Sequence, residues 1–188
     1  AIGKLKDHKI ELIIAGNGPL DNELREQAND LNNVTFIGRI LELPDFFKSL
    51  DLLVVPSIRE PLGNVCIEAG LYRVPVLASN IDGIAEIIEH EVSGELMDPD
   101  ERLSFESNND SAPLPEYVIN PDSQELQKPT QLNSTKLANK ILELSLSPEK
   151  LDLYVKNLHS NVIENFNLDV YSSKLKELYK KINSDNDV

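Results

Sequence analysis

The stretch from Val54 to Asn80 reads VVPSIREPLGNVCIEAGLYRVPVLASN. One short apolar run ends at Pro56, a loop rich in turn residues follows, and a second apolar run begins after Pro75. A short helix fits between the loop and the second run. Two buried apolar strands that are joined through a helix are typical of a parallel βαβ unit. This stretch therefore predicts an α/β fold with a parallel sheet.

Two carboxylates flank the predicted start of this helix. Glu60 lies on the loop and Glu68 follows on the helix, with the turn sequence Pro-Leu-Gly-Asn (61–64) between them. Unpaired N–H groups at a helix N-terminus favour a phosphate, and Gly63 would let the backbone approach one closely. A carboxylate on each side could accept hydrogen bonds from sugar or ribose hydroxyls. On spacing alone a second interpretation stays open, in which both glutamates are solvated surface residues.

Length and composition limit the classes of protein to which this chain can belong. The 188 residues suffice for one domain with a sizeable core, and the net charge of −14 argues against a nucleic-acid or anionic-membrane binder. Cys66 is the single cysteine, which excludes an internal disulfide and a cysteine zinc site. We expect no metal, because His8, His90 and His159 lack metal-ligand spacing. No apolar run reaches the roughly 18 residues of a membrane span.

The rest of the chain continues the alternation of strands and helices. The patterns predict strands at 10–15, 34–37, 52–55, 75–78 and 95–97, and helices at 21–31, 42–49 and 83–90. This alternation predicts a doubly wound α/β sheet, in which ligands gather at the carboxyl ends of the strands. The loops expected there contain Gly16, Gly38-Arg39, Glu60 and the segment 80–83.

The C-terminal half has two parts of different character. Residues 101–132 are rich in Asn, Ser, Pro and acidic residues without a sustained period, so we expect a mobile surface insertion with one brief strand at 117–119. Helical pattern returns at 134–183, and the last helix is expected to turn Val170, Leu175, Leu178 and Tyr179 inward. We predict that residues 1–188 form one domain with this insertion and these helices. Because the chain begins on what looks like a helix end, we expect it to be a piece of a longer protein.

Several blocks of the chain resemble one known family in order and spacing. Residues 56–79, PSIREPLGNVCIEAGLYRVPVLAS, are similar to the Glu-x7-Glu region of the retaining glycosyltransferases of family 4, which have the GT-B fold. Matching blocks precede and follow it: IIAGNGPL (13–20), NVTFIGRI (33–40), LPDFFKSLDLLVVPS (43–57), IDGIAEIIEHEVSGELMDPD (81–100) and SPEKLDLYVKNLHSNVIENFNLDVYSSKLKELY (147–179). The resemblance implies a Rossmann-like doubly wound parallel sheet, the C-terminal, donor-binding half of a GT-B glycosyltransferase.

The resemblance also implies roles for particular residues. Glu60 would act as the catalytic residue that hydrogen-bonds the donor sugar, and Glu68 would bind the ribose hydroxyls. Other residues would surround the nucleotide sugar: Pro61, Leu62, Gly63 and Asn64 at the diphosphate, Arg39 and Ile40 at the base, and Gly16 and Gly18 on the phosphate side. The reaction implied is sugar transfer with retained anomeric configuration, without a cofactor or an essential metal. Its physical requirement is stabilisation of a leaving diphosphate.

The resemblance further implies the partners of such a protein. They are a UDP- or GDP-sugar donor and a glycan or lipid-linked acceptor, which the N-terminal domain of a GT-B enzyme binds. We expect no nucleic acid as a partner, because the net charge of −14 argues against it, and we expect contact with a membrane to be peripheral at most. We expect the protein in the cytoplasm.

The chain departs from the family at several positions. The family supplies an Arg and a Lys for the diphosphate on the segment before the helix that ends at Lys9, and nothing in this sequence matches them or the acceptor domain. We therefore expect this chain by itself to bind nucleotide weakly and not to turn over. Arg73 stands where a glycine usually ends the helix, which we expect to strain that cap, and Asp82 and Ala85 replace a usual Gly and Pro. Two alternatives stay open: a non-catalytic nucleotide-sugar-binding module, and a sugar-nucleotide epimerase-like protein on the same fold.

Overall fold

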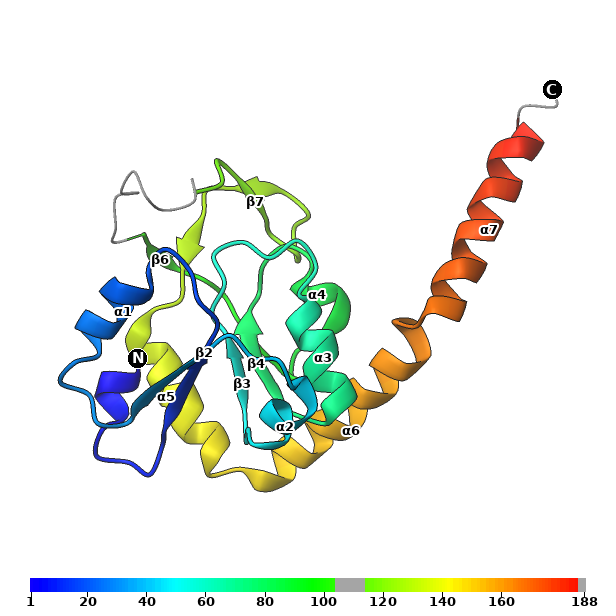
Figure 1. Cartoon of the computed structure of the whole chain (residues 1–188). Helices are drawn as coiled ribbons and strands as arrows, with labels where there is room; N and C mark the ends of the chain where they lie inside the picture. Colours follow the sequence, from blue (N-terminus) through cyan, green and yellow to red (C-terminus); the bar gives the residue numbers. More distant parts are fainter. Residues whose placement is uncertain (104–113, 186–188) are drawn as a thin grey trace.

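The computed structural model describes residues 1–103 and 114–185, and it confirms the α/β class with parallel strands (Figure 1). The N-terminal part contains a 3₁₀ helix η1 (Ile2–Leu5), strand β1 (Leu12–Ala15), helix α1 (Asp21–Gln27), strand β2 (Val34–Gly38) and helix α2 (Leu43–Lys48). η1 is a short 3₁₀ turn and not the end of an α-helix as expected. Its Leu5 side chain is buried, and η1 packs against a C-terminal helix.

The central part is the predicted βαβ unit and its continuation. Strand β3 (Leu53–Val55), helix α3 (Asn64–Tyr72), strand β4 (Val76–Ser79), helix α4 (Ile84–Ile87) and strand β5 (Glu95–Met97) follow one another. All four residues of β4 are buried, as expected of the middle strand of a parallel sheet that is covered on both faces. α4 is shorter than the predicted helix at 83–90, because Ile88 already has extended backbone.

The parallel strands of the described chain are divided between two sheets. β1 pairs with β2, and β3, β4 and β5 form a second sheet in that order, all in parallel register. The main core lies around the second sheet and includes Cys66, Val76, Ile81 and Ile84. The predicted apolar strands therefore all form, but which of them become neighbours depends on contacts that a local sequence pattern does not contain.

The described residues of the segment 101–132 include two short pairs of strands. It contains the antiparallel pair β6 (Glu101–Arg102) with β9 (Thr130–Gln131), and the hairpin of β7 (Val118–Ile119) with β8 (Leu126–Gln127). Val118 is 2% exposed and belongs to the main core, and Leu132 is 8% exposed. The prediction of a brief strand at 117–119 is confirmed by Val118–Ile119. The two buried side chains show that part of the segment packs against the body, and the mobility of the insertion stays a prediction. Residues 104–113 lie outside the described residues.

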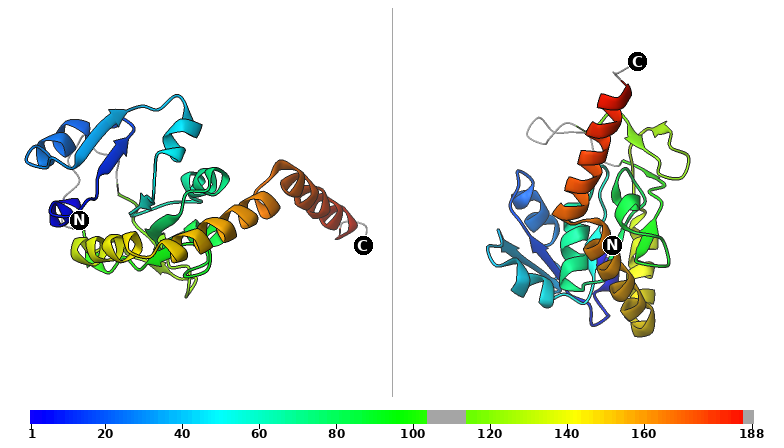
Figure 2. Two further views of the ribbon diagram at one scale, coloured as in Figure 1. Left: turned by 90° about the horizontal axis from the view of Figure 1, so that it is seen from below. Right: turned by 90° about the vertical axis from the view of Figure 1, so that its right-hand side faces the viewer.

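Three helices complete the chain: α5 (Ser134–Ser145), α6 (Pro148–Asn165) and α7 (Leu168–Asp185). α6 packs closely on α3, since a Cβ added at Gly70 would lie 2.7 Å from Cγ2 of Val162. α7 projects away from the body beyond the end of α6 (Figure 2), so Leu178 and Tyr179 are exposed and the prediction that they point inward is wrong. In the described part of the chain, none of the helices combines the length and apolar character needed to cross a bilayer.

Candidate functional site

The N-terminus of α3 presents backbone donors that have no partner in the described structure. Gly63 is the N-cap residue and adopts a left-handed conformation with φ 93°, where a side chain would be strained. No side chain caps this helix end, and the N–H groups of Asn64 and Val65 have no acceptor within the described residues. A helix N-terminus with free N–H groups carries partial positive charge and favours an anion.

Glu60 folds back onto this helix end. Its Oε1 accepts a hydrogen bond from the N–H of Gly63 at 3.1 Å, and the side chain is half-buried. Glu60 and Gly63 are three positions apart in the sequence, so the turn 61–63 itself brings the carboxylate to the amide. The sequence predicted that the Gly63 N–H would bind a diphosphate, whereas in this structure Glu60 occupies it. A ligand can use that N–H only after the Glu60 carboxylate has moved away.

Glu68 lies further along α3 and differs from Glu60 in its surroundings. It is half-buried, and within the described residues its carboxylate makes neither a hydrogen bond nor an ion pair. A carboxylate of this kind is available to accept hydrogen bonds from ligand hydroxyls. Pro61 and Asn64 are exposed beside it and Leu62 is half-buried, so all predicted residues of this group lie around one helix end.

A second loop supports the loop that carries Glu60. The N–H of Glu60 donates to Oδ2 of Asp82 at 3.0 Å, and the N–H of Gly83 donates to the carbonyl oxygen of Glu60 at 3.2 Å. Gly83 lies so close to the first loop that a Cβ there would be 2.2 Å from the carbonyl oxygen of Pro61. The position of Glu60 thus depends on residues 82 and 83.

The remaining predicted residues form a separate group on the β1–β2 sheet. The N–H of Gly16 donates to the carbonyl oxygen of Gly38 at 2.7 Å, which joins the turns after β1 and β2. Gly16, with φ 116°, Gly18 and Arg39 are exposed, and Ile40 is half-buried. The loops that follow β1 and β3 both lie toward the top of Figure 1, at the carboxyl ends of their strands. The structure therefore brings the predicted residues to one end of the molecule in two groups.

Cys66 lies under this site but is not part of its chemistry. The side chain is fully buried, and burial raises the pKa of its thiol to about 12, with a further contribution from the nearby charge of Glu60. Only the thiolate is nucleophilic. We therefore expect no labelling of the native protein by iodoacetamide at pH 8 and complete labelling after denaturation, as measured by intact mass. Stoichiometric labelling without denaturation would contradict the buried position.

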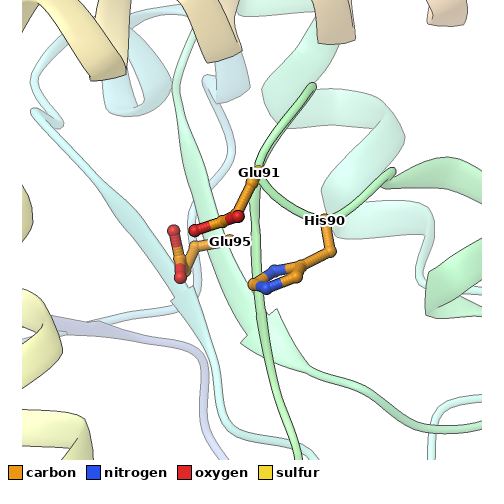
Figure 3. A group of neighbouring side chains, drawn as sticks. All are labelled: His90, Glu91 and Glu95. Carbon is orange, nitrogen blue, oxygen red and sulfur yellow. The ribbon is translucent and has the colours of Figure 1, made fainter.

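A cluster at the start of β5 has a structural explanation. Ligand atoms of His90, Glu91 and Glu95 lie within 4.8 Å of one another, and Figure 3 shows the Glu91 carboxylate turned toward that of Glu95. Glu95 is 2% exposed, and its carboxylate is bound by Lys140 at 3.0 Å, Lys150 at 3.1 Å and the Tyr154 hydroxyl at 2.8 Å. Nδ1 of His90 accepts a hydrogen bond from the N–H of Leu96 at 3.1 Å. These partners occupy Nδ1 of His90 and the Glu95 carboxylate, and Lys150 lies 3.9 Å from the exposed carboxylate of Glu91. The cluster therefore links α5 and α6 to the sheet.

The role of Asp82 was not predicted from the sequence, where this residue stood out only as a departure from the family. Asp82 has φ 46° and binds both the Glu60 loop and the β7–β8 hairpin. The dipeptide Asp82-Gly83 is a turn signal that could have drawn attention to a left-handed residue. The hydrogen bonds of Asp82 to Glu60 and Ile119, by contrast, cannot be predicted from the residues next to Asp82 in the sequence.

Comparison with known proteins identifies the kind of chain to which this site belongs. Residues 1–108 match the family model described as glycosyl transferases group 1. An uncharacterized glycosyltransferase of Methanocaldococcus jannaschii is 38% identical over 95 residues, which cover 48% of this chain and 24% of the relative. A GDP-mannose-dependent α-(1-6)-phosphatidylinositol monomannoside mannosyltransferase of Mycobacterium tuberculosis is 34% identical over 99 residues, which cover 46% and 26%.

A solved structure agrees over nearly the whole chain. The HepE protein of Anabaena in complex with UDP-glucose superposes with a TM-score of 0.70 at 24% identity, covering 96% of this chain and 44% of HepE. This likeness confirms the expected Rossmann-like fold of GT-B type. The chain thus spans about a quarter of the curated relatives and less than half of this structural neighbour.

Proposed function

The chain belongs to the family of group 1 glycosyl transferases, and from this premise we propose that it is the donor-binding part of an enzyme that transfers a sugar from a nucleotide diphosphate sugar. The observation that carries the proposal is the free N-terminus of α3 between two carboxylates. This arrangement offers donors to a diphosphate and acceptors to hydroxyl groups, which are the two kinds of polar group in a nucleotide sugar. The named functions of the relatives, which act on or bind GDP-mannose and UDP-glucose, support it.

Two glutamates have different roles in this proposal. Glu68 accepts hydrogen bonds from the ribose hydroxyls, because its carboxylate is unoccupied and half-buried on α3. Glu60 exchanges partners when the donor binds. Its carboxylate leaves the Gly63 N–H and accepts from a hydroxyl of the sugar, while the released N–H joins those of Leu62 and Asn64 at the diphosphate.

The other predicted residues surround the same ligand. Arg39 and Ile40 face the base, Pro61 borders the diphosphate, and Gly16 and Gly18 line the phosphate side from the turn that is hydrogen-bonded to Gly38. N–H donors at the diphosphate stabilise the leaving group as its charge grows, so the proposed transfer uses no cofactor and no essential metal.

The stereochemistry of the reaction, its acceptor and its location belong to the whole enzyme. The transfer retains anomeric configuration, as in family 4, and the acceptor is a glycan or lipid-linked glycan that binds to a separate, N-terminal domain of the enzyme. The proposed location is the cytoplasm, with at most peripheral contact with a membrane.

The proposal is tested by calorimetric titration of this chain with UDP, GDP and ADP. We expect one of these nucleotides to bind, and Glu68→Ala to weaken binding of that nucleotide about 10- to 100-fold, because hydrogen bonds to a charged acceptor contribute about 1.5–3 kcal/mol. Glu164→Ala on α6 is the matched control, since Glu164 is exposed and lies on another helix. Equal affinities of the wild-type chain and Glu68→Ala would contradict the role of Glu68. Absence of binding to all three nucleotides by the folded chain would count against donor binding by these residues alone.

A further inference from the structure

A hollow of about 680 Å³ lies beside the loop that carries Glu60. One wall consists of Arg59, Pro61 and the segment 82–86, and the opposite wall is the β7–β8 hairpin with Tyr117, Ile119 and Gln124. The hairpin lies at the top of the molecule in Figure 1, near the loop that precedes α3. The segment that was expected to be a surface insertion thus forms half of a cavity next to the proposed donor site.

The hairpin is held in place from several directions. Val118 packs in the main core. The N–H of Asp82 donates to the carbonyl oxygen of Ile119 at 3.0 Å, and the Ile119 N–H donates to Oδ1 of Asp82 at 2.7 Å. The amide of Asn80 donates to Oδ2 of Asp122 at 3.1 Å. These contacts give the hairpin a defined position relative to the loop at 80–83.

Asp82 joins the two walls through one carboxylate. Oδ1 accepts from Ile119 on the hairpin, and Oδ2 accepts at 3.0 Å from the N–H of Glu60, which lies between the lining residues Arg59 and Pro61 of the opposite wall. Its φ of 46° is unfavourable for most side chains, and aspartate tolerates it better than most. The distance between Glu60 and the hairpin is therefore set by this residue.

The lining has the chemistry of a site for a polyhydroxyl ring. Arg59, Glu86 and Gln124 supply a cation, an anion and an amide, so the hollow offers both hydrogen-bond donors and acceptors. Tyr117 is 46% exposed and adds an aromatic ring, which Lys128 positions from 4.2 Å above its centroid. A sugar ring combines hydroxyl groups with apolar C–H faces and fits such a lining.

We infer that the β7–β8 hairpin is a wall of a saccharide subsite next to Glu60, and that Asp82 is the positioning residue that holds this wall at the correct distance. The inference rests on the proposed function, because it names the sugar-binding part of the same site. The ring that enters is either the transferred sugar of the donor or a sugar of the acceptor. Both present the same chemistry to the hollow.

The test uses Asp82→Gly, because glycine keeps the backbone at φ 46° without strain while both carboxylate hydrogen bonds disappear. UDP, UDP-glucose, GDP and GDP-mannose are titrated by calorimetry, and methyl α-glucoside and methyl α-mannoside are titrated in the presence of the nucleotide that binds. Amide exchange is measured at Glu60 and Ile119. Asp82→Asn retains one oxygen acceptor. Glu91→Gly is the matched control, since Glu91 also has positive φ, with a value of 60°, and lies outside the hollow.

We expect Asp82→Gly to leave nucleotide affinity within about twofold of wild type and to reduce the affinity gained from the sugar at least about tenfold. The Glu60 and Ile119 amides should exchange at least about tenfold faster, and Asp82→Asn should be intermediate. If Asp82→Gly loses the extra affinity that the nucleotide sugar has over the nucleotide, the subsite binds the sugar of the donor. If Asp82→Gly instead loses binding of the methyl glycoside, the subsite binds a sugar of the acceptor. Unchanged sugar binding in Asp82→Gly would overturn the inference, as would an equal loss for nucleotide and nucleotide sugar. Failure of the wild-type chain to bind any nucleotide would instead reject the proposed function and this inference with it, while amide exchange would still report on the Asp82 contacts.

Discussion

Replacement of Glu95 by glutamine is expected to destabilise the fold by about 3 kcal/mol or more, because removal of one partner from a buried ion pair leaves the other charge uncompensated. The carboxylate is 2% exposed and binds Lys140, Lys150 and Tyr154. An amide of the same size keeps the volume but leaves the ammonium groups of Lys140 and Lys150 with only the exposed carboxylates of Glu143 and Glu91 as counter-charges. Urea unfolding followed by circular dichroism measures the change.

Two further variants test whether the loss of stability in Glu95→Gln comes from the network of hydrogen bonds and ion pairs around Glu95. Tyr154→Phe removes one hydrogen bond and is expected to cost about 1–2 kcal/mol. Glu143→Gln changes a carboxylate that is about half exposed and also pairs with Lys140, and it should cost less than about 1 kcal/mol. If Glu95→Gln were no more destabilising than Glu143→Gln, the network would not be a stabilising element of the fold.

The same network predicts how stability depends on pH. Burial acts to raise the pKa of Glu95, but hydrogen bonds from Lys140, Tyr154 and Lys150 outweigh it and hold the pKa below its ordinary value. The stability that Glu95 contributes is therefore present above its ordinary pKa and is lost as the pH falls through the lowered pKa of the folded state. Burial and the bond to Glu95 raise the pKa of Tyr154 from 10.0 to about 12, so its contribution is lost as the pH rises through that range. In Glu95→Gln the acid-side loss of stability should be smaller than in wild type.

Gly83→Ala is expected to disrupt the site more than any other small substitution in the two loops. Its Cβ would lie 2.2 Å from the carbonyl oxygen of Pro61 and 2.9 Å from Cα of Leu62, so the Glu60 loop would have to move as backbone. Overpacking of this kind costs about 1–3 kcal/mol. Because the displaced loop carries Glu60 and leads into α3, we expect the nucleotide that binds the wild type to bind at least about tenfold more weakly.

Gly3→Ala provides the matched control for this prediction, because Gly3 lies in η1 and not in the proposed site. An added Cβ at Gly3 would lie 3.5 Å from Cδ2 of Leu31, which is ordinary van der Waals contact, and the residue does not have positive φ. Its stability and nucleotide affinity should stay within experimental error of wild type in the same urea and calorimetric measurements. Wild-type affinity in Gly83→Ala would show that the contact between the two loops is not needed for binding.

Local sequence patterns were enough to predict the α/β class and the βαβ unit, and they predicted that the candidate residues would lie at the carboxyl ends of the strands. A buried strand needs a continuous apolar run, and proline and glycine, here Pro61 and Gly63, favour turns through their own backbone preferences. These features can therefore be recognised without knowledge of distant residues. The ordered blocks around Glu60 and Glu68 likewise predicted a glycosyltransferase, which the match of residues 1–108 to the group 1 glycosyl transferases confirms, while family 4 stays a prediction. The particular roles of these residues stay predictions.

Other features depend on how distant segments come together in the folded chain. Asp82 binds residues 22 and 37 positions away, Glu95 meets Tyr154 from 59 positions away, and Val118 enters a core built by other segments. Each of these contacts joins residues that are far apart in the sequence, so a local repeat of apolar residues cannot predict it. None of the residues, taken alone, is distinguished from an ordinary surface residue. The exposure of Leu178 and Tyr179 has the same origin, since an amphipathic helix predicts an apolar face but not whether the body of the molecule lies against it. The position of a saccharide wall opposite Glu60 is therefore a property of the folded chain and not of any one of its motifs.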